Sequence, residues 1–123
     1  MRRPDIIIAI ANPQLRTRLI ELLEAQAVAT QASRNLEDLY ELLAQRSSDE
    51  MHARSVLVLE EAFIYPHVYE ECAHIKAVSR QPLTIVLLVE PRTRTRSDWN
   101  GADHILRLPM HVDEIVDRIV GFL

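Results

Sequence analysis

The clearest pattern along the chain is a set of short apolar runs with no regular alternation of polar residues. Residues 5–11, 56–59 and 83–89 are the strongest of these runs. Strands buried on both faces have this composition, because helices cover both sides of a parallel sheet. Residues 27–33 and 104–108 are shorter or more polar and predict two further strands. We therefore expect the three apolar runs at the centre of the sheet.

Between the predicted strands, apolar residues recur at helical spacing. Asn12 is followed by proline, a pair typical of a helix start, and this helix should end near Gln26. Asn35 is expected to cap a second helix, and residues 66–78 and 92–100 predict a third helix and a short fourth one. The apolar positions of the first helix are Leu15, Leu19, Leu22 and Leu23, and those of the second are Leu36, Leu39, Tyr40 and Leu43. The third helix has Val68, Cys72, Ile75 and Val78. The last helix has Val112, Ile115, Val116, Ile119 and Val120.

The order of these elements, strand and helix in alternation, predicts a parallel sheet with helices on both faces. Residues 47–54 are polar and predict a surface loop. Ligands of such sheets bind outside the carboxyl ends of the central strands. Those ends are residues 10–12, 60–61 and 88–90, so any chemistry typical of the fold is expected there.

Composition narrows the class of protein. The 123 residues and 14.2 kDa fit one domain, and Cys72 is the only cysteine, which indicates a reducing, cytoplasmic environment. The net charge of −4 disfavours nucleic acid as a partner, and no apolar run is long enough to cross a bilayer. Gly101 and Gly121 are the only glycines, which excludes a glycine-rich phosphate loop.

Several segments together resemble the receiver domain of bacterial response regulators. The most specific is residues 101–110, where Gly-Ala-Asp precedes the fifth predicted strand and Leu-Pro follows it; the family has Lys-Pro. Residues 11–24 resemble the family's first turn and helix, and residues 28–32 also match. The resemblance covers essentially the whole chain. It implies a flavodoxin-like (CheY-like) doubly wound (βα)5 fold, with a five-stranded parallel sheet in the order 2-1-3-4-5.

The positions of the family's phosphorylation pocket depart from the family pattern. Receivers hold Mg²⁺ with two acidic residues after the first strand, and the aligned residues here are Ile10 and Ala11. The phosphoacceptor aspartate aligns with Glu60, and the length of the following loop leaves Glu61 as an alternative equivalent. A ligand set without carboxylates does not suit Mg²⁺, which prefers oxygen.

Two further pocket positions are apolar as well. Leu88 aligns with the Ser or Thr that ends the family's fourth strand, and Leu108 with the lysine before proline. Phosphoryl transfer requires the developing charge to be neutralised, and these side chains offer neither a cation nor an oxygen. We therefore interpret the chain as a degenerate receiver, a pseudo-receiver, whose pocket is replaced by side chains that pack.

The resemblance and these replacements together imply a signalling domain that works by phosphorylation-independent protein–protein contact, with no catalytic residue, metal or cofactor. Two alternatives stay open. One is a phosphoaccepting receiver of a two-component phosphorelay that uses Glu60 or Glu61, and the other is a small-ligand sensor at the strand ends. A permanent phosphoaspartate mimic at Glu60 is disfavoured, because Leu108 supplies no cationic partner.

Other polar and reactive residues have simpler interpretations. His67, Glu71 and His74 share one face of the predicted third helix, but no fourth ligand accompanies them, and a solvated face is favoured over a metal site. Cys72 has no neighbouring cation to stabilise a thiolate, and we expect it to be a small buried residue.

The candidate interaction face is the one on which receivers commonly signal, formed by the fourth helix, fifth strand and fifth helix. Arginine and tryptophan are enriched in interface hot spots. The partner is expected to be a signalling protein, an attached effector or kinase domain, or a second copy of the chain. Residues 1–123 are expected to form a single receiver-like domain, which can be one part of a longer protein. The residues of this face are Arg92, Arg94, Arg96, Trp99, His104 and Arg107.

Overall fold

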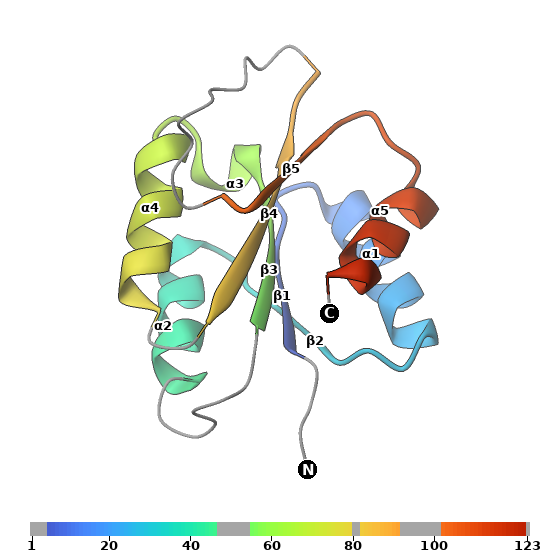
Figure 1. Cartoon of the computed structure of the whole chain (residues 1–123), viewed down its shortest axis with the longest axis horizontal. Helices are drawn as coiled ribbons and strands as arrows, with labels where there is room; N and C mark the ends of the chain where they lie inside the picture. Colours follow the sequence, from blue (N-terminus) through green and yellow to red (C-terminus); the bar gives the residue numbers. More distant parts are fainter. Residues whose placement is uncertain (1–4, 47–54, 80–81, 92–101, 123) are drawn as a thin grey trace.

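The protein folds around a five-stranded sheet, seen nearly edge-on in Figure 1. The computed structural model describes residues 5–46, 55–79, 82–91 and 102–122. All neighbouring strands are parallel, and their order is β2-β1-β3-β4-β5, which confirms the predicted flavodoxin-like sheet. The strands are β1 (Asp5–Ala9), β2 (Thr30–Ala32), β3 (Ser55–Glu60), β4 (Leu83–Val89) and β5 (His104–Arg107).

Helices cover both faces of the sheet. One face is covered by α1 and α5, and the other by α2 and α4 (Figure 1). Doubly wound topology produces this arrangement, because right-handed crossovers on either side of the first strand place their helices on opposite faces. The helices are α1 (Pro13–Ala25), α2 (Leu36–Arg46), α3 (Glu61–Ile64), α4 (Val68–Val78) and α5 (Val112–Gly121).

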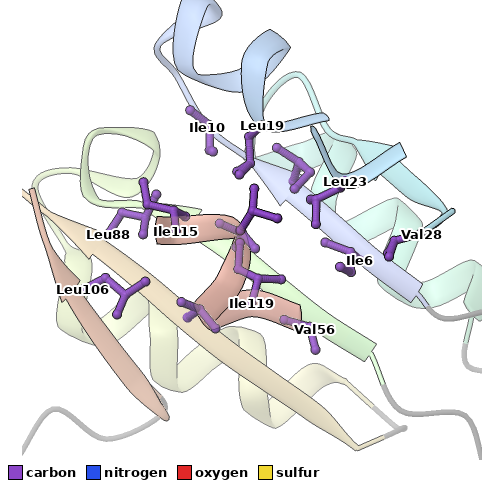
Figure 2. Close-up of a cluster of buried hydrophobic side chains, with 14 residues drawn as sticks. Ile6, Ile10, Leu19, Leu23, Val28, Val56, Leu88, Leu106, Ile115 and Ile119 are labelled. Atoms are coloured by element: carbon purple, nitrogen blue, oxygen red, sulfur yellow. The ribbon is translucent and has the colours of Figure 1, made fainter. Parts of the chain in front are cut away.

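The strands divide the buried side chains into two clusters, one on each face. Alternate residues of a strand point to opposite sides, so Ile6 and Ile8 face α1 and α5 whereas Ile7 faces α2 and α4. The fully buried strand residues explain why the sequence runs are apolar without alternation. The first cluster, drawn in Figure 2, includes Ile6, Ile10, Leu19, Leu23, Val28, Val56, Leu88, Leu106, Ile115 and Ile119.

The helix starts follow the capping residues predicted from the sequence. Asn12 Oδ1 accepts hydrogen bonds from the backbone N–H groups of Gln14 and Leu15, at 3.0 and 3.2 Å. Asn35 Oδ1 accepts one from Asp38 N at 2.8 Å. Each bond satisfies an N–H group that has no partner within its helix. Among the described residues, no helix is sufficiently long and apolar to span a membrane.

The second strand and the segment after Glu60 differ from the prediction. The second strand is shorter than residues 27–33, because Ala27 adopts a φ of 61° and the N–H of Val28 bonds to Leu23 O, which closes the end of α1. The loop predicted after Glu60 contains the short helix α3. The predicted short helix at residues 92–100 lies outside the described residues.

Candidate functional site

The carboxyl edge of the sheet brings together four of the five predicted pocket residues, and the fifth, Ala11, is exposed in the turn that follows Ile10. Glu60 is the last residue of β3 and pairs in register with Leu88 of β4. Ile10 directly follows β1, and Leu108 directly follows β5. We call Ile10, Glu60, Leu88 and Leu108 the edge cluster.

The apolar members of the edge cluster are packed within the protein. Ile10 and Leu88 have no exposed surface, and both belong to the buried cluster that contains Ile115 of α5 (Figure 2). Leu108 is half-buried and packs against the same cluster, and its N–H donates to Val89 O at 2.8 Å. These side chains fill the position with carbon atoms and present no group that could ligate a cation or accept a proton.

Glu60 is the one charged member, and its carboxylate is directed to the turn between β1 and α1. Its exposed fraction is 5%. Oε1 accepts a hydrogen bond from Ala11 N at 2.8 Å and another from Asn12 N at 3.1 Å. A buried carboxylate needs such donors, since burial without partners is costly. Asn12 also caps α1, so the carboxylate lies near the positive end of that helix dipole.

The guanidinium of Arg16, on α1, binds a backbone carbonyl at the start of the same turn. Arg16 Nη1 donates to Ile10 O at 3.1 Å, and Arg16 N donates to Asn12 O at 3.0 Å. The turn is therefore held on its N–H side by Glu60 and on its carbonyl side by Arg16. Arg16 was not among the predicted site residues; its place one turn after the cap was the available signal.

Glu61 points to a different strand. It is half-buried at the start of α3, and its Oε1 accepts a hydrogen bond from Glu90 N at 3.0 Å, just after β4. Arg107 Nη1 in turn donates to Glu90 O and Pro91 O, at 3.2 and 3.0 Å. The two adjacent glutamates thus diverge: Glu60 holds the end of β1, and Glu61 holds the end of β4.

The predicted row of His67, Glu71 and His74 is divided by the structure. His67 precedes α4 and is exposed, whereas Glu71 and His74 both contact Tyr40 of α2. The Tyr40 hydroxyl donates to Glu71 Oε1 at 2.8 Å and lies 2.9 Å from His74 Nδ1. We call Tyr40, Glu71 and His74 the α2–α4 junction. The described part of the chain contains no group of three or more His, Cys, Asp or Glu side chains placed to hold a metal ion.

Two groups near this junction are poor acids because of their surroundings. Burial, followed by the hydrogen bond to Glu71 and its charge, raises the pKa of the Tyr40 hydroxyl above its usual range. Burial and then the charge of Glu71 raise the pKa of the Cys72 thiol to about 11. Cys72 is free and buried, and it remains a thiol at neutral pH.

The candidate interaction face is described only in part. Arg92, Arg94, Arg96 and Trp99 lie outside the described residues. His104 is exposed at the start of β5 and stacks on Phe122, with ring centroids 3.8 Å apart and planes 8° from parallel. Arg107 is engaged with the carbonyl groups that follow β4.

The start of this face is fastened to the sheet by an ion pair that the sequence analysis did not single out. Lys76 Nζ of α4 lies 2.7 Å from Asp103 Oδ2 and donates to Leu83 O at 2.6 Å. Asp103 Oδ2 also accepts from Ile85 N at 2.8 Å. The Asp of the Gly-Ala-Asp segment therefore joins α4, β4 and the entry to β5.

Comparisons with known proteins agree with this fold. No protein-family model and no curated protein sequence matches the chain. Among solved structures, the chain is similar to the crystal structure of a CheY-like response regulator receiver domain protein from Methanospirillum hungatei JF-1. The TM-score is 0.74 at 12% sequence identity, over 98% of this chain and 94% of that chain. At this identity the likeness establishes the CheY-like fold over the whole length.

Proposed function

We propose that this domain is an atypical receiver that acts by protein–protein contact and accepts no phosphoryl group. The main support is the packing and hydrogen bonding at the carboxyl edge of the sheet. Ile10 and Leu88 are fully buried, and Glu60 is engaged by backbone N–H groups. A phosphoryl group at Glu60 would have to displace those hydrogen bonds and would lie among apolar side chains without Mg²⁺ ligands.

The two alternatives require features that the edge cluster does not supply. Phosphorylation of Glu61 would place the charge beside Glu90, and the carboxylate of Glu61 already accepts the Glu90 N–H. A small-ligand sensor would need space at the strand ends, where Ile10, Leu88 and Leu108 pack together with α5. Neither alternative has an observation that favours it over the contact-based function.

A titration with a phosphoryl mimic tests the proposal. Two-dimensional NMR spectra are recorded with increasing beryllofluoride and Mg²⁺, and intact mass is measured after incubation with acetyl phosphate and Mg²⁺. We expect no saturable shifts at residues 10–12, 60–62 and 88–90, and no mass gain. The reference is a receiver with an intact acidic pocket, treated identically.

Either a saturable shift or a phosphoryl adduct would contradict the proposal. In that case Glu60→Gln and Glu61→Gln would identify the acceptor, because only one of them should abolish the adduct. The two variants change adjacent residues whose carboxylates bond to different strands, so each serves as the control for the other.

For the working surface we propose the face around β5 and α5. Its sequence carries Arg92, Arg94 and Arg96, and arginine forms paired hydrogen bonds with carboxylates. An acidic partner or a second copy of the chain fits that chemistry, in the cytoplasm and without a membrane. The partner can be a separate signalling protein or an attached effector or kinase domain.

A triple arginine variant tests this surface. Arg92/Arg94/Arg96→Ala is compared with Arg18/Arg34→Ala, which removes two exposed arginines from α1 and from the turn before α2. Sedimentation and co-purification from the native host are measured for both. We expect only the first variant to lose association. Loss in the control variant alone would place the working surface on another face.

A further inference from the structure

We infer that Glu60 is a built-in anion that holds the turn between β1 and α1 against the end of β3. The backbone N–H groups of Ala11 and Asn12 form a binding site for one carboxylate, and the chain fills this site with its own side chain. The inference rests on the proposed function, in which no phosphoryl group is accepted at this edge. Because the contact is made within the chain and needs no ligand, it holds the edge constitutively.

The geometry of the carboxylate supports this role. Both donors bond to a single oxygen, Oε1, at 2.8 and 3.1 Å, and they come from successive residues of the turn. The residue separations are 49 and 48, so the contact joins distant parts of the chain. Hydrogen bonds to an ionised acceptor are stronger than those between neutral groups.

The contact affects the placement of α1, because the turn leads directly into that helix. Asn12 caps α1, a helix of 13 residues that packs against α5 on the same side of the sheet. The carboxylate therefore fixes where α1 begins relative to β3, and it lies at the end of the helix that favours negative charge. Arg16 holds the carbonyl of Ile10 from the other side.

The length of the side chain matters as well. Glu60 ends β3, and the residue before it, Leu59, pairs with Ala9 across the sheet. The turn begins one residue beyond that pair, and the glutamate side chain reaches its N–H groups from the adjacent strand. An aspartate would place the carboxylate one methylene closer to β3 and farther from both donors.

Removal of the carboxylate should expose a vacant anion site of known shape. Glu60→Ala deletes a fragment equivalent to acetate, and the two donor groups remain on the backbone. A ligand that binds only the folded protein stabilises it by mass action. Acetate is therefore expected to stabilise Glu60→Ala and to leave the wild-type protein unaffected, since its own carboxylate occupies the site.

The experiment combines amide hydrogen exchange with an acetate titration. In Glu60→Ala, we expect Ala11 N–H and Asn12 N–H to exchange about tenfold faster than in wild type, with little change in α2 or α4. Acetate at about 100 mM should raise the midpoint of thermal unfolding of this variant only, relative to chloride at equal ionic strength.

Two further variants keep the test decisive. Glu61→Ala removes the adjacent carboxylate, which bonds to Glu90 N, and should leave exchange at Ala11 and Asn12 unchanged. Glu60→Gln keeps the shape and an oxygen acceptor but removes the charge, so it should fold and still exchange faster at these two amides.

Three results would overturn the inference: unchanged exchange at both amides in Glu60→Gln, a uniform rise across the sheet in Glu60→Ala, or equal acetate effects on wild type and variant. Each is distinguishable from failure of the proposed function. Binding of beryllofluoride by the wild-type protein would refute the proposed function, and it is measured separately from these exchange rates.

Discussion

The edge cluster and the α2–α4 junction lie on opposite faces of the sheet and differ in how they use polar side chains. At the edge, three apolar residues pack in or against one buried cluster, and the single carboxylate bonds to backbone N–H groups. At the junction, the hydroxyl of a tyrosine on α2 bonds to a glutamate and to a histidine, both on α4. The carboxyl edge, where ligands of such sheets usually bind, is therefore the more buried of the two regions.

The comparison shows that a titratable side chain is not by itself a sign of function. Glu60 aligns with the phosphoacceptor position of receivers, yet its carboxylate accepts hydrogen bonds from the backbone of a turn. Glu71 and His74 form part of a row that could have bound a metal, and they position a helix pair through Tyr40. Glu60, Glu71 and His74 each have a partner within the chain. Among the described residues, no buried side-chain nitrogen or oxygen lacks a hydrogen-bond partner.

The largest predicted effect concerns the apolar side of the edge. Leu88→Ala should lower the free energy of unfolding by about 2–5 kcal/mol, because it leaves a cavity beneath α5 in a fully buried cluster. Urea denaturation monitored by circular dichroism measures the change. Val78→Ala, at a side chain that is 41% exposed, is the control and should change it by less than about 0.5 kcal/mol. Equal effects would mean that the edge is loosely packed.

A second substitution tests whether the edge accepts a charge. Leu108→Lys should lower the free energy of unfolding by about 1–2 kcal/mol, because Leu108 packs against the buried cluster and the new ammonium must be desolvated or reoriented. Ala77→Lys adds the same charge at an exposed position in the last turn of α4 and is the control. An unchanged urea midpoint for Leu108→Lys would indicate an open, hydrated pocket.

The sheet and its helices were predictable because the relevant signals are local. The apolar runs at residues 5–11, 56–59 and 83–89 identify central strands, and Asn12 and Asn35 mark helix starts; all have the expected place in the structure. Boundaries were less predictable. The left-handed conformation of Ala27 shortens the second strand, and no glycine in the sequence marks it.

The contacts of the candidate site were not predictable from local pattern. The bond from Glu60 to Ala11 joins residues that are 49 positions apart, and it depends on the parallel pairing of β1 with β3. Tyr40 was assigned to the apolar side of its helix, which is correct for its ring, but its hydroxyl reaches Glu71 of α4. Such partners become visible only when the register and the helix packing are known.

The smallest predicted effect concerns the α2–α4 junction, and it follows from the number of protons available there. A hydroxyl has one proton, and the Tyr40 hydroxyl gives it to Glu71, an ionised carboxylate that can only accept. His74 Nδ1, 2.9 Å from the same oxygen, must then carry a hydrogen to complete the second bond.

Tyr40→Phe removes both bonds and should lower the free energy of unfolding by about 1 kcal/mol. Tyr65→Phe removes a hydroxyl from a residue that is 73% exposed, and it should have no measurable effect on urea denaturation. Nitrogen-15 shifts of His74 supply the independent measurement: the Nδ1–H form should dominate in wild type and decline in Tyr40→Phe. An Nε2–H form in wild type would reverse the proposed direction of the bond, and an unchanged unfolding midpoint in Tyr40→Phe would mean that solvent replaces the junction without cost.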